Sequence, residues 1–186
     1  MKDKVISGST KEEVLSQLQA DLSPDDILNY NALLKLNGKE VLFYMDIDLG
    51  GGFEGGSEFM QFKATLKSNS VFRFAIHDKK FADDIGKFFG MMDVEVGYPD
   101  LDKHLIIKTN DEQKVRSLFE DAGLRETFTQ LNSFDCGIHL HHPNGNPTKQ
   151  PFLELYTNQV IKDPATFRNV FDAFYQLLSE VDNGYV

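Results

Sequence analysis

The sequence predicts an α+β fold, in which an antiparallel sheet of about seven strands carries amphipathic helices on one face, within a single domain spanning residues 1–186. Two observations support this prediction. Several short segments alternate apolar and polar residues and are joined by short turns, as antiparallel neighbours require. Other segments carry one apolar stripe at helical spacing, and such a stripe needs a sheet face to cover.

The first elements have the clearest local signals. Thr10 and Glu13 form a capping box ahead of apolar residues at helical spacing, which predicts a helix. Residues 27–36 then alternate with a period of two, and residues 41–49 alternate back. Between them, Asn37-Gly38 is the residue pair typical of a type I′ turn, so these segments are predicted to form a β-hairpin.

A glycine-rich run, residues 50–56, separates this hairpin from the next strand. Its glycines match the spacing of a phosphate-binding turn, but the following residues alternate as a strand and do not begin a helix, so a dinucleotide-binding role is disfavoured. We predict a loop there, with Phe53 at its tip as a candidate contact residue. Alternating residues 60–66 and 71–76 complete a predicted four-strand N-terminal meander.

The second half mixes helices and strands. The predicted elements are a helix over residues 81–92, a buried strand at 104–109, a helix capped by Asn110 or Asp111, a short helix at 124–131, strands at 134–140 and 152–157, and a long helix opened by Asp163-Pro164.

Composition narrows the classes of function. Asp and Glu number 29 against 19 Lys and Arg, for a net charge of −10, which opposes binding to nucleic acid or to an anionic membrane surface. The single cysteine cannot form an internal disulfide. No apolar leader and no stretch long enough to cross a membrane is evident, so we expect a cytoplasmic protein.

Four carboxylates gather around a Gly-Tyr-Pro turn, at Asp93, Glu95, Asp100 and Asp102. With Phe53, these are the candidate binding residues, and a basic protein or peptide is the partner that an acidic surface would attract. A structural interpretation competes with this one. In it, Gly97 adopts a positive φ angle, and Asp93 or Asp102 accepts hydrogen bonds from the turn amides.

This segment also carries a sequence resemblance. Residues 88–97 read Phe-Phe-Gly-Met-Met-Asp-Val-Glu-Val-Gly and are followed by Asp102 and the predicted strand 105–108. The run resembles an F-G-x-x-D-[IV]-x-[VT]-G pattern found in uncharacterised bacterial proteins of unknown function. Because those proteins have no established activity, the resemblance implies no role for any residue.

A histidine cluster suggests an alternative function. His139 and His141 fall on the same face of their predicted strand, at a spacing that would suit two imidazoles on one metal ion, and Glu154 on the neighbouring strand is the nearest third ligand. The alternative is therefore a metal-dependent enzyme. Cys136 is predicted to point to the opposite face, away from His139.

No nucleophile–base pair, opposed carboxylate pair or full ligand set is complete in the sequence. The leading hypothesis is a non-enzymatic domain that binds protein or peptide through an acidic surface and needs no cofactor. Exposed sheet edges leave homodimerisation by sheet extension open.

Overall fold

The computed structural model describes residues 4–23, 26–51, 55–67, 71–79, 91–142 and 147–182. The described strands are β1 (Lys4–Gly8), β2 (Asn29–Leu36), β3 (Lys39–Asp48), β4 (Ser57–Thr65), β5 (Phe74–Asp78), β6 (Met92–Asp93), β7 (Leu105–Thr109), β8 (Phe134–His141) and β9 (Gln150–Thr157). The described helices are α1 (Lys11–Leu22), α2 (Pro99–His104), α3 (Glu112–Leu118), α4 (Ala122–Gln130) and α5 (Pro164–Asp182).

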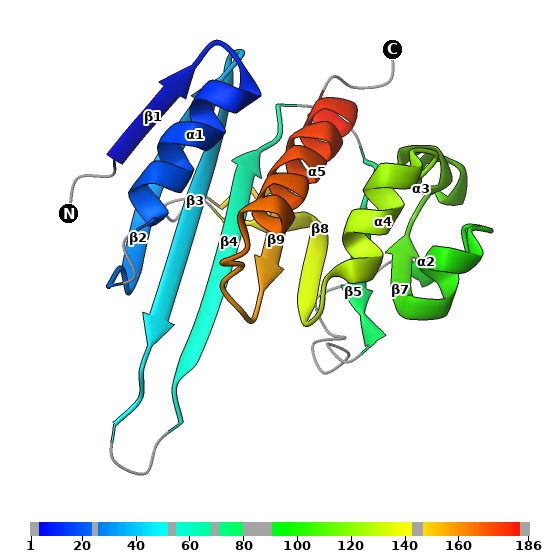
Figure 1. Ribbon diagram of the computed structural model, residues 1–186. Helices are drawn as coiled ribbons and strands as arrows, with labels where there is room; N and C mark the ends of the chain where they lie inside the picture. Colours follow the sequence, from blue (N-terminus) through cyan, green and yellow to red (C-terminus); the bar gives the residue numbers. More distant parts are fainter. Residues whose placement is uncertain are drawn as a thin grey trace.

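The described strands form one mixed sheet, in the order β1-β2-β3-β4-β9-β8-β5-β7-β6. Figure 1 shows α1, α5 and α4 lying side by side in front of this sheet. The predicted α+β class is confirmed, but the predicted strand number is too low. The sheet is also not wholly antiparallel, because β1 runs parallel to β2 and is joined to it through α1.

The predicted four-strand meander is wrong in its fourth member. β2, β3 and β4 are consecutive antiparallel neighbours, whereas β5 lies beyond β9 and β8. Residues 66–73 join β4 to β5, and a connection of this length is not confined to a tight hairpin. The C-terminal hairpin β8–β9 therefore occupies the position that sequence proximity had assigned to β5.

Local signals at the turns and helix starts are confirmed. Asn37 and Gly38 have φ angles of 51° and 72°, as a type I′ turn requires. The Thr10 hydroxyl accepts a hydrogen bond from the Glu13 amide, and the Glu13 carboxylate accepts one from the Ser9 amide. Asp163 likewise accepts from the Thr166 amide at the start of α5. The predicted helix 81–92 falls on residues of which 81–90 lie outside the described ranges.

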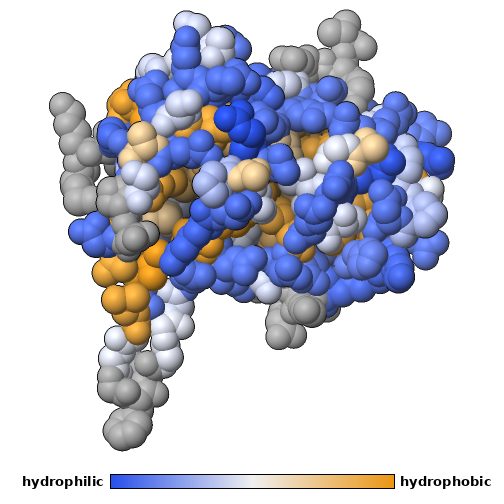
Figure 2. All heavy atoms as spheres, in the orientation of Figure 1, coloured by the Kyte–Doolittle hydropathy of each residue, from blue (hydrophilic) through white to orange (hydrophobic). Residues whose placement is uncertain are grey.

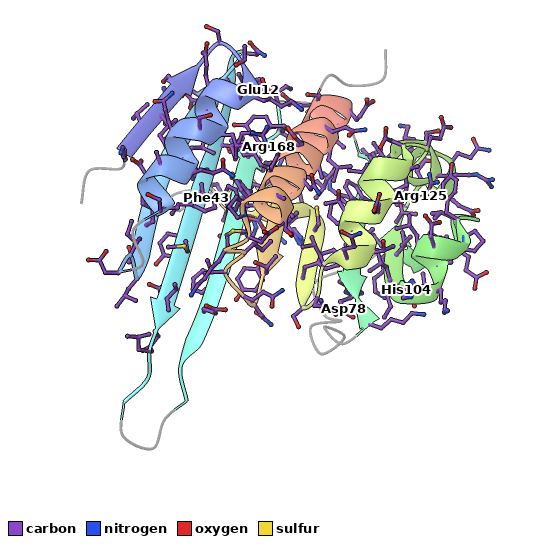
Figure 3. The ribbon with its side chains drawn as sticks, viewed as in Figure 1. Glu12, Phe43, Asp78, His104, Arg125 and Arg168 are labelled. Atoms are coloured by element: carbon purple, nitrogen blue, oxygen red, sulfur yellow. The ribbon has the colours of Figure 1, made fainter. Side chains whose placement is uncertain are left out.

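The core is a layer of apolar side chains between the sheet and the helices. Phe62 is its centre, since its ring lies 4.8 Å from that of Phe43 on β3 and 5.4 Å from that of Phe174 on α5. Figure 3 labels Phe43 in this layer, beneath the helices. Alternate residues of β2, β3 and β4 supply the sheet side of the layer, as the period of two predicts. None of the described helices is both long and apolar enough to span a membrane.

Candidate functional site

An apolar pocket lies between the C-terminal end of α1, the segment before α5, and the sheet. Its volume is about 340 Å³. Nine of the twelve described residues that line it are apolar, namely Leu22, Ile27, Met45, Ile47, Met60, Val160, Ile161, Pro164 and Phe167, and the remaining three are Gln19, Ser23 and Lys162. This composition matches the lining of ordinary ligand sites, which are mostly apolar with a few polar groups.

The pocket exists because the helices stop before the strands do. α1 ends at Leu22 and α5 begins at Pro164, and both ends lie at the pocket's rim. β3 and β4 continue past them as a two-stranded arm, so the helix-facing side chains Met45, Met60 and Ile47 form a floor that lacks a full helical roof. Met45 and Met60 are buried, and Ile47 is half-buried.

Apolar surface continues outward from this pocket. Leu49 follows Met45 and Ile47 on the helix-facing side of β3 and is 72% exposed, and Leu28 beside Ile47 is 41% exposed. Figure 2 shows apolar surface gathered where the arm leaves the body of the molecule. The alternation over residues 41–49 predicts one continuous apolar strand face. The structure buries the inner part of this face, which includes Met45, and leaves Leu49 at its outer end exposed.

The polar groups at the rim are few and mostly engaged. The Gln19 amide donates to the Pro164 carbonyl at 3.1 Å, and the Ser23 hydroxyl donates to the Ala20 carbonyl at 2.9 Å. Among the described lining residues, Lys162 is the one ionisable side chain. These described residues include no acid–base pair and no nucleophile with its base, and the chemistry that they support is burial of apolar groups.

The four predicted acidic residues lie apart from this pocket, and three of them bind groups of the protein itself. The Asp102 carboxylate accepts hydrogen bonds from the Val96 and Gly97 amides, each at 2.9 Å, and Gly97 has a φ angle of 81°. Asp93 pairs with Lys108 on β7. The structural interpretation of this turn is therefore correct for Asp102 and Gly97.

Asp100 makes the third internal contact, a 2.9 Å ion pair with Arg125 on α4. Partial burial opposes ionisation of Asp100, but the Arg125 guanidinium outweighs it and holds the pKa of this carboxyl below its usual range. Glu95 is exposed. Phe53, the other predicted contact residue, lies outside the described residues.

The histidine cluster lies on the sheet face opposite the helices and consists of two polar pairs. His141 Nε2 lies 2.9 Å from Glu154 Oε2, so the predicted proximity of these residues is confirmed. His139 instead lies 3.2 Å from Asp135, and its ring centroid is 6.4 Å from that of His141. Across the described part of the chain, no three His, Cys, Asp or Glu side chains are grouped so that they could hold a metal ion.

Lys63 completes the Glu154 pair, with its amine 2.6 Å from Glu154 Oε1. Burial disfavours the charged form of Glu154, but the Lys63 and His141 contacts outweigh it, and the pKa of this carboxyl is lowered. The group that sequence reasoning offered as a third metal ligand is thus engaged by a lysine. Cys136 is fully buried on the helix-facing side, as predicted, and burial raises the pKa of its thiol.

Sequence reasoning found the apolar residues of the pocket but not the pocket. Met45, Ile47 and Met60 were predicted on apolar strand faces, which explains their hydrophobicity without a cavity, and Ile27 was predicted only as the start of the alternating segment 27–36. The one local signal was Val160-Ile161, an apolar pair in a connecting segment that carries no strand or helix pattern. It could have indicated a loop folded over an apolar surface.

Comparisons with known proteins add a fold likeness only. No family model matches the sequence, and no curated protein matches it significantly. Among solved structures, the mycobacterial trehalose monomycolate transport factor A, TtfA, is similar with a TM-score of 0.48 and 8% sequence identity, over 92% of this chain and 83% of that one. This likeness is too low to transfer a role to any residue.

Proposed function

We propose that the protein is a binding domain that holds an apolar segment of a partner protein in the pocket at the base of the β3–β4 arm. One observation carries the proposal: a pocket of about 340 Å³ with nine apolar lining residues opens onto the exposed apolar side chains Leu28 and Leu49. Monomeric proteins rarely leave contiguous apolar surface open unless something binds it.

The size of the pocket indicates how strong the association is. Burying one aliphatic side chain contributes about 1.5–3 kcal/mol. Two such anchors contribute about 3–6 kcal/mol before the entropic cost of association, which corresponds to a weak complex at best. We therefore expect a transient partner, unless contacts outside the pocket add to the affinity.

The net charge of −10 supports a partner segment flanked by basic residues. The acidic 93–102 turn is a weaker basis for the contact, because Asp93, Asp100 and Asp102 already bind Lys108, Arg125 and turn amides. We therefore place the binding of a protein or peptide at the pocket and not at the acidic turn.

The test is selection of phage-displayed linear peptides on the purified protein, followed by calorimetry with the enriched peptides. Val160→Trp fills the pocket, and Val5→Trp makes the same change on β1, where Val5 is 55% exposed and does not line the pocket. Glu95→Lys reverses an exposed charge in the acidic turn. Thermal unfolding of each variant verifies that it is folded.

We expect enriched peptides to contain aliphatic residues and to bind wild type and Val5→Trp alike, but Val160→Trp at least tenfold more weakly. Equal affinity for Val160→Trp, or a selection that yields no binding peptide, would contradict the proposal. If instead Glu95→Lys abolishes binding while Val160→Trp does not, the acidic turn is the binding surface.

A further inference from the structure

The β3–β4 arm has an open strand edge beside the pocket. β3 and β4 stay paired out to Asp48 and Ser57. On one side, the pairing of β4 with β9 already ends at Met60 and Thr157. Figure 1 shows the lower ends of β3 and β4 projecting beyond the other strands. The outer residues of β4 therefore lack a third strand within the described part of the sheet.

The hydrogen-bond pattern identifies which residue offers its backbone to that open edge. The Ile47 amide donates to the Leu28 carbonyl at 2.6 Å, so the backbone groups of Ile47 point toward β2. Ile47 is opposite Glu58, and the two must then form a non-hydrogen-bonded pair of the antiparallel ladder. Since bonding groups alternate along a strand, the N–H and C=O of Glu58 point away from β3, toward the line that β9 would follow if it continued.

After β9, the chain turns away from the position beside Glu58. Asn158 donates its amide to the Ser133 carbonyl, on the β8 side, and the Thr157 hydroxyl donates to the Gln159 carbonyl. Val160 and Ile161 then reach the pocket on the helix side. Of the described strands, only β3 is in register with Glu58.

The edge and the pocket share one face of the arm. Glu58 alternates with Met60 on β4, so both side chains point to the helix side, where Met60 and the Ile47 opposite Glu58 line the pocket. A residue paired with Glu58 from outside would direct its side chain to this same face, because directly opposed residues share a face.

We infer that the partner segment binds as an extended strand, which pairs with the backbone of Glu58 on the open edge of β4 while an apolar side chain of that segment enters the pocket. This inference rests on the proposed function.

An extended peptide satisfies both features, because strand addition supplies main-chain hydrogen bonds and the pocket selects a side chain. An acyl chain would fill the pocket but leave the Glu58 N–H and C=O unused. The Glu58 carboxylate favours Lys or Arg in the segment near that position.

The first test uses the wild-type protein and an enriched peptide that contacts the pocket. Each peptide amide is N-methylated in turn, which removes one hydrogen-bond donor at a time. Strand addition predicts at least a tenfold loss of affinity at alternate positions and little change between them, because only every second amide faces β4. Tolerance of N-methylation at all positions would overturn the inference.

The second test changes the protein. Glu58→Pro removes the edge amide, and the β3–β4 ladder survives because Glu58 and Ile47 exchange no hydrogen bond; proline is tolerated at such edge positions. Glu58→Ala is the matched control, since it removes the carboxylate and keeps the amide. We expect at least tenfold weaker peptide binding for Glu58→Pro and a change within about threefold for Glu58→Ala. If Glu58→Pro fails to fold, the N-methyl series decides.

The outcomes separate the inference from the proposed function. If Val160→Trp weakens binding while the N-methyl series and Glu58→Pro have no effect, the pocket binds a partner segment but strand pairing is wrong. If no peptide depends on the pocket at all, the proposed function fails and the strand inference fails with it.

Discussion

The two faces of the sheet belong to the same strands but differ in the interactions that stabilise them. On the helix side, Phe62 of β4 contacts four other aromatic rings, those of Phe43, Phe167, Phe171 and Phe174. On the opposite side, the next residue of β4, Lys63, pairs with Glu154 on the neighbouring strand β9. One face is thus held by apolar packing and the other by paired polar groups.

The two faces should therefore contribute unequally to the stability of the fold. The opposite face carries aromatic rings too, among them the half-buried series Tyr44, Phe59 and Tyr156, whose neighbouring centroids lie 5.3 and 5.5 Å apart and whose two tyrosines carry a polar hydroxyl. Burial of the phenylalanine layer contributes in proportion to its area. Ion pairs near water contribute less, so substitutions on the two faces should differ several-fold in cost.

The largest effect is expected on the helix side. Phe62→Ala removes a fully buried ring from the centre of the aromatic layer and leaves a cavity among rigid neighbours. We expect a loss of about 3–5 kcal/mol in the free energy of unfolding, measured by urea denaturation. A loss below about 1 kcal/mol would show that the layer does not dominate stability.

The substitution Gly137→Ala on β8 tests whether the sheet tolerates added side-chain volume between β8 and β5. A Cβ at this position would lie 2.3 Å from the Phe74 carbonyl oxygen and 2.7 Å from the Ala75 Cα, both backbone atoms of β5. Gly137→Ala therefore forces β5 and β8 apart, at an expected cost of about 1–3 kcal/mol. Urea denaturation measures it, and Gly51→Ala, where the added Cβ meets nothing within 4 Å, is the control.

The Lys63–Glu154 pair should have a smaller and pH-dependent effect. Glu154→Gln removes the charge from a side chain that is 10% exposed and leaves Lys63 without its carboxylate, at an expected cost of about 1–2 kcal/mol at pH 7. The folded pKa of Glu154 is lowered, so its stabilising contribution is present above the unfolded value of about 4.3 and is lost as the pH falls through the folded value.

The stability difference between wild type and Glu154→Gln should accordingly narrow as the pH falls below about 4. Denaturation across this range measures it. A difference that did not narrow below about pH 4 would mean that the pKa of Glu154 is not lowered in the folded protein.

The smallest effect is expected at Leu42, which lies on the face opposite the helices and is 41% exposed. Leu42→Thr keeps a residue that favours strands and removes little buried area, so the free energy of unfolding should change by less than about 0.5 kcal/mol. A larger loss would show that something packs on this part of the face.

Local features of the fold were predictable and long-range ones were not. The Asn37-Gly38 turn, the Thr10 cap and the Asp163 cap each depend on a few adjacent residues, and all three are confirmed. β1 was missed because five residues near the chain start show no sustained alternation. α2 was missed because Tyr98-Pro99 indicated a turn, although proline also suits the first turn of a helix.

The candidate site shows the same limit. The acidic residues 93–102 were identified by composition, but composition does not reveal that Arg125 comes from α4 to meet Asp100. Likewise, the period of a strand places His139 and His141 on one face, while the contact of Lys63 with Glu154 depends on which strand lies beside β9. The pocket depends on where two helices end relative to two strands, which no local pattern encodes.

The place of the β8–β9 hairpin has a consequence for how the chain folds. β9 pairs with β4 and β8 pairs with β5, so this hairpin joins the β1–β4 part of the sheet to the β5–β7 part. During synthesis, the strand that connects the two parts emerges only after both of them. The β4–β9 pairing joins residues separated by about half of the chain length, and long-range pairings of this kind slow folding. Until Gln150–Thr157 is available, β4 presents its whole inner edge, not only the outer residues around Glu58, to any strand that it meets.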